Sequence, residues 1–241
     1  MWPFNKVKKL EESGLFQGFT DWHSHILPGV DDGIPSMEKS LEVLRRYEEK
    51  GIRKVWLTPH IMEDYPNTTA ALRNRFAELR DAYTGSIELR LASENMLDSL
   101  FEERLESRDL LPIGEEGNHL LVETSYMNPP YGFKDMLDQA MKTGYYILLA
   151  HPERYRYMDE GDYRQLKEMG IKFQTNFASL VGGYGGTARK KAEWLLKEGM
   201  VDVCGSDLHR LGFFDESIQL SPKKREGLEA LMKVAENPVI K

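Results

Sequence analysis

Two histidines and three acids lie within one thirteen-residue stretch near the start of the chain, DWHSHILPGVDDG at residues 21–33. A short strand is expected to end here, and because side chains alternate along a strand, His23 and His25 would share a face. Neutral imidazole nitrogens bind divalent ions such as Zn, Mn or Fe, and Asp31 or Asp32 could add oxygen ligands. Taken alone, the stretch fits an ordinary surface His-x-His beside an Asp-Asp-Gly turn as well as it fits a metal site. The residues elsewhere in the chain that could complete a metal site must decide between the two.

Residues that can bind metal also follow most of the other predicted strands, at the point where each strand ends. They are His60 in TPH, Glu94, Glu123, His151 in AHPERY, and Asp207 and His209 in GSDLH. Five of the six histidines in the chain lie at strand ends. The sixth, His119, begins a strand and would lie about 13 Å from the far end of that strand, so it is expected to be structural. The strand over 171–175 supplies no such residue.

The elements that must position these residues follow from the hydrophobic pattern. Seven short runs rich in Val, Ile, Leu and aromatic residues predict strands over 19–23, 54–58, 87–92, 119–123, 146–150, 171–175 and 201–205. Apolar residues at helical spacing separate them, and a last helix is expected near 224–236. Glycines predict left-handed caps at helix ends at Gly51, Gly85, Gly144, Gly170 and Gly199.

Strands that alternate with helices imply parallel β-α units, so we predict an α/β fold, a distorted (β/α)7 TIM-like barrel. An open doubly wound sheet is the alternative, although no Gly-rich phosphate loop follows the first strand. In a (β/α) barrel the carboxyl ends of all strands meet at one face, where catalysis takes place. The candidate ligands are therefore expected to converge there.

Five imidazoles and four carboxylates exceed what one or two ions need, at three or four protein ligands each. The carboxylates would repel one another at one barrel mouth without cations. Three divalent ions would bring about +6 against −4 from the carboxylates, which leaves about +2 to receive a dianionic phosphate. Such ions are suited to phosphoester hydrolysis, because they activate a bound water and hold both the attacking and the leaving oxygen of an in-line displacement.

Length and composition limit the remaining possibilities. The chain has 241 residues, of which 41% are apolar, enough for one full core, and we expect an N-terminal arm over 1–18 and a single barrel domain over 19–241. A net charge of −7 argues against nucleic acid as an obligate partner. No apolar run is long enough to span a membrane. A single cysteine, Cys204, fits a reducing compartment, so a cytoplasmic protein is expected.

Taken together, HSHILPGVDDG, TPH, the two strand-end glutamates, AHPERY and GSDLH resemble the PHP (polymerase and histidinol phosphatase) superfamily. The resemblance spans about residues 19–215 and is greatest to the bacterial metal-dependent protein-tyrosine phosphatases of capsule and exopolysaccharide operons. It implies three divalent ions, with manganese expected and iron or zinc as alternatives. The ligand sets it implies are His23, His25, Glu94 and Asp207 for the first ion, Glu94, Glu123 and His151 for the second, and Asp32, His60 and His209 for the third.

Two acids favour the tyrosine phosphatase branch of that superfamily. General PHP phosphoesterases tend to have a histidine where Asp32 and Glu123 stand here. For the aspartate, Asp32 is a better match than Asp31. The histidinol phosphatases are correspondingly disfavoured.

The resemblance also assigns arginines to the substrate. Arg154 matches the arginine that relatives direct at the substrate phosphate, which a guanidinium binds well. Its alternative is an ion pair with Glu153 or another acid at the rim. Relatives often carry a second arginine after the final histidine, where this chain has phenylalanines at positions 213 and 214, and Arg210 could substitute.

The activity implied is hydrolysis of phosphotyrosine on an autophosphorylating bacterial tyrosine kinase that regulates polysaccharide synthesis and presents a tyrosine-rich tail. A metal-bridging hydroxide would attack phosphorus, with Arg154, Asp207 and His209 at the catalytic centre and Arg210 as a further substrate contact. Loops over 126–133 and 178–186 could bind the aryl ring. The alternatives are a PHP-type small-molecule phosphoesterase resembling histidinol phosphatase, a nuclease, a metal amidohydrolase, and a non-catalytic metal-stabilised module that binds the kinase.

One segment has the residue spacing of a different class of tyrosine phosphatase. The segment CGSDLHR, from Cys204 to Arg210, has the C-x5-R spacing of cysteine-dependent tyrosine phosphatases. In that arrangement Asp207 would face a phosphate dianion. Cys204 moreover continues the strand VDVCG as a small buried residue, so we reject it as the nucleophile.

Overall fold

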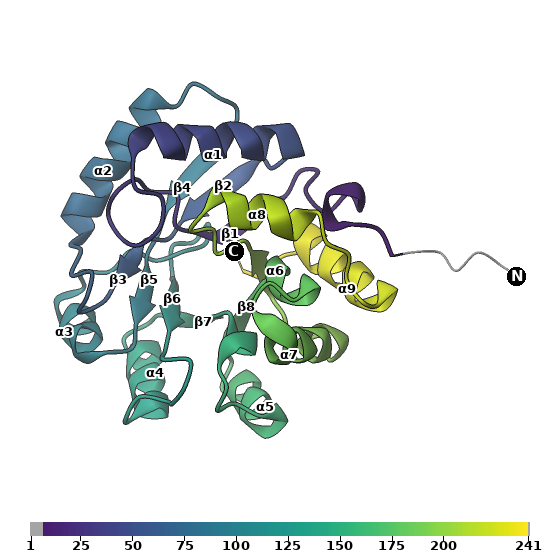
Figure 1. Ribbon diagram of the computed structural model, residues 1–241. Helices are drawn as coiled ribbons and strands as arrows, with labels where there is room; N and C mark the ends of the chain where they lie inside the picture. Colours follow the sequence, from purple (N-terminus) through teal and green to yellow (C-terminus); the bar gives the residue numbers. More distant parts are fainter. Residues whose placement is uncertain (1–6, 241) are drawn as a thin grey trace, which may run out of the picture.

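The computed structural model describes residues 7–240 and has a ring of helices around central parallel strands (Figure 1). Three strands form one sheet in the order β1 (Thr20–Ser24), β2 (Lys54–Leu57) and β4 (Glu88–Leu91). Six form a second, in the order β3 (His60–Ile61), β5 (Glu94–Met96), β6 (His119–Glu123), β7 (Tyr146–Ala150), β8 (Lys172–Asn176) and β9 (Val203–Gly205). A parallel bridge between Ser24 and Leu208 brings the end of β9 back to β1.

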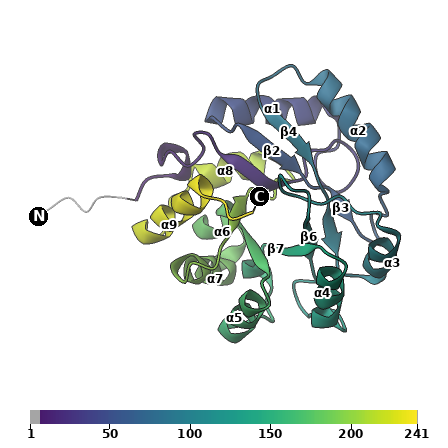
Figure 2. The same cartoon turned by 180° about the vertical axis from the view of Figure 1, so that it is seen from behind.

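Helices follow the strands on the outside, as Figure 2 shows from behind. They are α1 (Met37–Lys50), α2 (Thr69–Ala82), α3 (Ser99–Ser107), α4 (Phe133–Lys142), α5 (Glu160–Glu168), α6 (Phe177–Val181), α7 (Gly185–Lys197), α8 (Leu211–Ile218) and α9 (Arg225–Glu236). Two 3-10 turns, η1 (Leu10–Glu12) and η2 (Pro152–Arg154), complete the elements. The predicted α/β class and distorted (β/α)7 barrel are confirmed.

Each of the seven predicted strands is present, and two of them are continued by short extra strands. After β2, Pro59 has no N–H to donate, and its carbonyl instead accepts the N–H of Glu94 at 3.1 Å. After β4, the Ser93 N–H turns to the carbonyl of Leu111, also at 3.1 Å. The chain therefore changes sheet at both points, and the new pieces, β3 and β5, begin at His60 and Glu94.

Glycines end several helices as the sequence predicts. Gly51, Gly144, Gly170 and Gly199 have φ between 67° and 100°, a region that favours a residue without Cβ. The prediction for Gly85 is wrong, because α2 already ends at Ala82 and the next residue is extended, with φ −88° and ψ 120°.

The end of the barrel opposite the strand carboxyl ends is filled by apolar side chains. Trp22 and Trp56 stack with ring centroids 6.0 Å apart, and Ile240, next to the C-terminus, is buried in the same cluster. The carbonyl of Asp202 accepts the N–H of Val239 and fixes this last segment. The packed floor leaves polar side chains at the other end of the strands.

Part of the predicted N-terminal arm packs on the barrel. Leu10, Leu15 and Phe16 are buried, and the ring of Phe16 lies 5.3 Å from that of Phe177 in α6. Residues 1–6 of that arm lie outside the described part of the chain, and the boundary at residue 18 stays a prediction. Within 7–240, every helix is too short or too polar to span a membrane.

Candidate metal centre and active site

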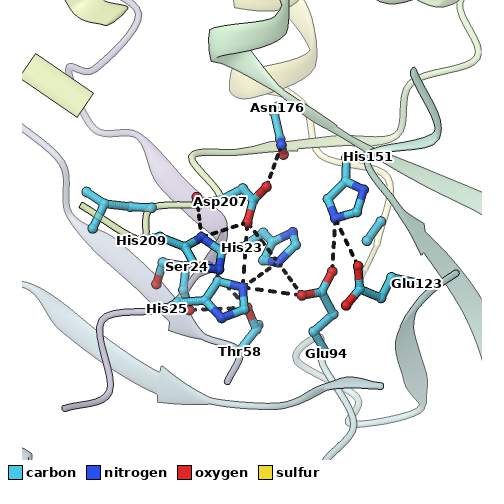
Figure 3. A network of polar contacts seen from close by, with 12 residues as sticks. His23, Ser24, His25, Thr58, Glu94, Glu123, His151, Asn176, Asp207 and His209 are labelled. Atoms are coloured by element: carbon cyan, nitrogen blue, oxygen red, sulfur yellow. Dashed lines mark hydrogen bonds and ion pairs between the residues drawn. The ribbon is translucent and has the colours of Figure 1, made fainter. Parts of the chain in front are cut away.

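The predicted ligands lie together at the carboxyl ends of the strands. Figure 3 shows His23, His25, Glu94, Glu123, His151, Asp207 and His209 among them. All are at most 9% exposed in their side chains except Asp32 and His209, which are 52% and 26% exposed and lie at the mouth. Four groups have ligand atoms mutually within 4.8 Å: His25, Asp32, His60 and His209; His23, His25 and Asp207; His23, Glu94 and His151; and His60, Glu94 and Glu123.

The set implied for the first ion is the most compact. His23 Nε2 and His25 Nε2 lie 3.1 Å apart, and Glu94 Oε2 is 3.2 and 3.3 Å from them. Asp207 Oδ1 lies 3.7 and 3.6 Å from the same two nitrogens. Ligand atoms about 2.1 Å from one ion lie roughly 3.0 to 3.4 Å apart at octahedral or tetrahedral angles. The two nitrogens together with either carboxylate thus have nearly the spacing of one coordination shell.

His60 joins the other two sets, because its ring has one nitrogen on each side. Its Nδ1 is 3.1 Å from both Glu94 Oε2 and Glu123 Oε1, while its Nε2 is 3.5 Å from Asp32 Oδ1. His209 Nε2 reaches the same aspartate oxygen at 3.4 Å. The sequence assigned His60 to the third set alone and did not predict its contact with the two glutamates.

Two buried atoms in this cluster fit a cation directly. Glu94 Oε2 and His60 Nδ1 have no hydrogen-bond partner within residues 7–240, although they lie 3.1 Å apart. A buried polar atom without a partner is costly, and a carboxylate oxygen beside several imidazole nitrogens is a typical metal-ligand set. The residues present therefore fit divalent ions.

The outer nitrogens of the two β1 histidines are fixed by side chains behind them. His23 Nδ1 lies 2.8 Å from Gln174 Oε1, and His25 Nδ1 lies 2.8 Å from Asp31 Oδ2. Such contacts select the tautomer and turn the ring so that Nε2 faces the ion. Asp31 thus supports a ligand from behind, and Asp32 is the one that points toward the cluster.

The strand over 171–175 was predicted to supply no metal-binding residue, but it supports the site through amide side chains that the sequence did not single out. Besides Gln174, the end of β8 carries Asn176, whose amide donates to Asp207 Oδ2 at 2.8 Å. The two polar residues alternate with Phe173 and Thr175, so period-two spacing in a buried strand was the available signal. They escaped notice because amides are not themselves preferred metal ligands.

Charges in the cluster shift the pKa values of its members. Burial alone would lower the pKa of His23, but the carboxylates of Glu94 and Asp207 raise it to about 9. His60 shows the same opposition, and the glutamates raise its pKa to about 10. The hydrogen bond from His209 lowers the pKa of Asp32 to about 2. The site therefore favours positive charge, and without ions protons occupy positions that metal would take.

The loops that carry two of the ligands have unusual backbones. His151 and Asp207 have φ of 32° and 52°, in the left-handed region that costs a non-glycine residue about 1 kcal/mol or more. Gly205, just before, lies so close to β1 that an added Cβ would be 2.8 Å from the Cβ of His23. The packed strands hold both turns in place, as is common at functional sites.

A pocket of about 410 Å³ opens over the cluster, and Arg154 lies in its wall. The guanidinium carbon lies 4.3 Å from the ring centroids of both Tyr126 and Tyr184. One nitrogen, Nη1, donates to Asp207 Oδ2 at 2.5 Å. The predicted alternative of an ion pair is therefore present, but with Asp207 rather than Glu153. Glu153 accepts hydrogen bonds from Asn176 and Ser179 instead.

The structure also gives the positions of the other residues that the sequence analysis considered. Arg210 is exposed at the start of α8 and lines the pocket mouth, and Phe213 lines its wall. His119 lies at the opposite end of β6 from Glu123, packed against a tyrosine ring. Cys204 is 1% exposed, and burial raises the pKa of its thiol well above the usual value, which argues against a thiolate nucleophile.

A (β/α) barrel with imidazoles and carboxylates gathered at its strand ends defines a metal-dependent hydrolase. Residues 19–235 match the model of the family described as "Capsular polysaccharide synthesis, CpsB/CapC". The chain belongs to the CpsB/CapC family, and the predicted resemblance to the phosphatases of capsule operons is confirmed.

Two relatives and one solved structure agree with this assignment. Tyrosine-protein phosphatase YwqE of Bacillus subtilis is 28% identical over 197 residues, covering 79% of this chain and 77% of its own. Tyrosine-protein phosphatase CpsB of Streptococcus pneumoniae is 25% identical over 235 residues, covering 90% and 96%. A crystal structure from work on YwqE and CpsB as metal-dependent tyrosine phosphatases superposes with a TM-score of 0.75 at 26% identity, over 89% of this chain and 86% of that one.

More distant structures share the fold alone. A histidinol phosphate phosphatase from Lactococcus lactis, solved with zinc, L-histidinol and phosphate, has a TM-score of 0.52 at 13% identity and covers 90% of this chain and 94% of its own.

Proposed function

We propose that this protein is a metal-dependent protein-tyrosine phosphatase that acts on a phosphorylated bacterial tyrosine kinase of a capsule or exopolysaccharide system, through a tyrosine-rich tail of that kinase. The observation that carries the proposal is an arginine fixed between two tyrosine rings, beside a buried cluster of imidazoles and carboxylates. Family membership and the names of the relatives support it. A cytoplasmic location and a single domain over 19–241 are part of the same proposal.

Three divalent ions, manganese first and iron or zinc as alternatives, would be held by the clustered side chains. The sets are His23, His25, Glu94 and Asp207 for one ion, Glu94, Glu123 and His151 for a second, and Asp32, His60 and His209 for a third. When bound, such ions polarise phosphoryl oxygens and lower the pKa of a coordinated water toward about 7.

Arg154 binds the substrate phosphate in this proposal. Its fork has five N–H donors, and only Nη1 is engaged by Asp207. The two tyrosine rings, each with its centroid 4.3 Å from the guanidinium carbon, hold the group in place, so its other donors are ordered before substrate arrives. A charged donor that is already in position stabilises the negative charge that develops on the phosphoryl oxygens in the transition state.

Asp207 connects the arginine to the ligand cluster. Its Oδ1 faces the imidazoles of His23 and His25, and its Oδ2 accepts hydrogen bonds from Arg154, Asn176 and Tyr184. Both oxygens are therefore directed, and the carboxylate cannot rotate without breaking these contacts. His209 lies beside it, with Nδ1 3.0 Å from the Asp207 carbonyl, and turns Nε2 toward Asp32 at the mouth.

The pocket walls suit an aryl ester. Tyr126, Tyr184 and Phe213 line it, and the last two rings pack edge to face with centroids 5.4 Å apart. Aromatic walls bind a ring by stacking or edge contacts. Arg210 at the mouth would contact the substrate as well, since it lines the pocket and is exposed.

The test is turnover by the manganese-loaded protein of a phosphotyrosine peptide, of histidinol phosphate and of DNA. Release of phosphate mainly from the peptide is expected. A preference for histidinol phosphate would favour the small-molecule alternative. Binding to the phosphorylated kinase without phosphate release from any phosphotyrosine peptide would favour the non-catalytic module and refute the proposal.

A further inference from the structure

A second cavity, of about 430 Å³, lies next to the catalytic pocket and is not used by the chemistry above. It shares Asp32, His209 and Arg210 with that pocket, so the two lie side by side with these residues between them. The rest of its lining comes from the segment after the ligand loop, from the first turns of α1 and from the start of α8. These residues are Gly33, Ile34, Pro35, Lys39, Glu42, Val43 and Leu211. We call this cavity the α1–α8 groove.

Helices α1 and α8 lie side by side in both views of the fold (Figures 1 and 2). An ion pair between Arg46 and Asp215, with a nitrogen–oxygen distance of 2.7 Å, joins them away from the site. Their other ends, near Lys39 and Leu211, border the α1–α8 groove. The groove is thus bounded by linked helices and shares one wall with the catalytic pocket.

The lining of the groove is apolar, with its charges mostly balanced. Pro35 is exposed and Leu211 half-buried, and they present the apolar surface, while Ile34 and Val43, 4% and 1% exposed, lie beneath it. Lys39 and Glu42 neutralise each other at the rim through a contact of 2.7 Å. Arg210 and Asp32 bring opposite charges to the junction with the catalytic pocket. A charged side chain therefore gains little here, whereas an aliphatic one buries its surface.

We propose that the α1–α8 groove binds the aliphatic side chain of a residue adjacent to the phosphotyrosine in the substrate peptide. The inference rests on the proposed function, because it assumes that phosphotyrosine occupies the catalytic pocket. A peptide whose phosphotyrosine lies in the catalytic pocket must leave it through the pocket mouth. The Cα atoms of the two adjacent residues lie only about 3.8 Å from the Cα of the phosphotyrosine. The mouth residues that form one wall of the groove then bring the adjacent side chain to the apolar surface.

The experiment compares phosphotyrosine peptides that carry Leu, Gly, Glu or Lys on either side of the phosphotyrosine, with manganese-loaded protein. We expect leucine on one of the two sides to raise kcat/KM about tenfold over glycine, the size of effect that a small apolar contact gives. Peptides with a non-hydrolysable phosphonate in place of phosphate, titrated calorimetrically, should show the same order in Kd.

Leu211→Lys is the matched change in the protein. It places a positive charge in the groove, so the ratio of leucine-peptide to free O-phosphotyrosine turnover should fall and the preference should move to glutamate. The control is Leu220→Lys, at a leucine that is 47% exposed, just past the end of α8 and outside the groove lining. The control should keep the wild-type preference for leucine.

Three results overturn the inference in distinguishable ways. Turnover of free O-phosphotyrosine with kcat/KM equal within twofold for all flanking residues would refute the groove alone. No turnover of free O-phosphotyrosine or of any peptide by the wild-type protein would refute the proposed function, and the groove with it. Retention of the leucine preference in Leu211→Lys would also contradict the assignment of this cavity.

Discussion

Replacement of Arg154 by alanine tests the link between the metal cluster and the substrate. The wild-type side chain is 19% exposed, and its guanidinium lies 4.3 Å from the centroids of two tyrosine rings and donates to Asp207 at 2.5 Å. If its free donors bind the phosphate in the transition state, alanine should lower kcat by about 10² to 10³, as loss of one ordered donor does elsewhere. That factor corresponds to about 2.7–4 kcal/mol of transition-state stabilisation.

A structural effect through Asp207 is the competing explanation, and the geometry separates the two. Asp207 Oδ2 keeps its contacts with Asn176 and Tyr184 after the arginine is removed, so its Oδ1 should still face the imidazoles. Metal content of Arg154→Ala should therefore stay near that of wild type. Arg154→Lys keeps the charge but loses the planar fork, and its activity should lie between the two.

The assay is steady-state turnover of p-nitrophenyl phosphate and a phosphotyrosine peptide, with metal content by mass spectrometry and inhibition by inorganic phosphate. We expect weaker inhibition by phosphate in Arg154→Ala at unchanged metal content. Activity of the alanine variant within threefold of wild type would refute a role in phosphate binding. Loss of metal together with activity would show that the arginine acts through Asp207 instead.

Three further predictions concern the cluster and the cysteine. Glu94→Gln removes the carboxylate that faces four imidazoles, so the purified protein should contain at least one ion fewer by mass spectrometry, and an unchanged content would contradict the ligand sets. The pKa values of His23 and His60 are raised from the usual 6.5 to about 9 and about 10. Because the folded protein holds these protons more tightly than the unfolded chain, their protonation stabilises the metal-free fold fully below about pH 6.5. This stabilisation is lost as the pH rises through 9 to 10. The Tm of the metal-free protein should accordingly fall over that window, and manganese binding at pH 7 should release protons in calorimetry with two buffers; a rising Tm and no proton release would refute the shifts. Cys204→Ser should retain metal-dependent turnover, whereas activity that resists chelation but vanishes in this variant would revive the thiolate mechanism.

Much of the fold and site could be predicted because it rests on strong local signals. Buried parallel strands read as short apolar runs, and a ligand directly after such a run has its position set by the barrel. His23, His25, Glu123 and His151 are of this kind. Helices α6 and α8 were not predicted, since α6 begins with no break after β8 and the eight residues of α8 are too few to show a helical period clearly.

What escaped prediction depends on distant segments. The pairing of Arg154 with Asp207 joins residues 53 apart in the chain, and the contact of His23 with Gln174 joins residues 151 apart. The break between β2 and β3 turns His60 so that each ring nitrogen faces a different set of carboxylates. Spacing along the chain identifies which residues bind, but the third dimension decides which of them share an ion.

The central claim is that these side chains hold three ions. It is tested most directly by a crystal structure of the manganese-loaded protein, with ions located by anomalous scattering at the manganese edge. We predict three ions, with Glu94 shared by two of them and Asp32 directed at the third. Two ions, or an Asp32 that points away from the cluster, would contradict the account.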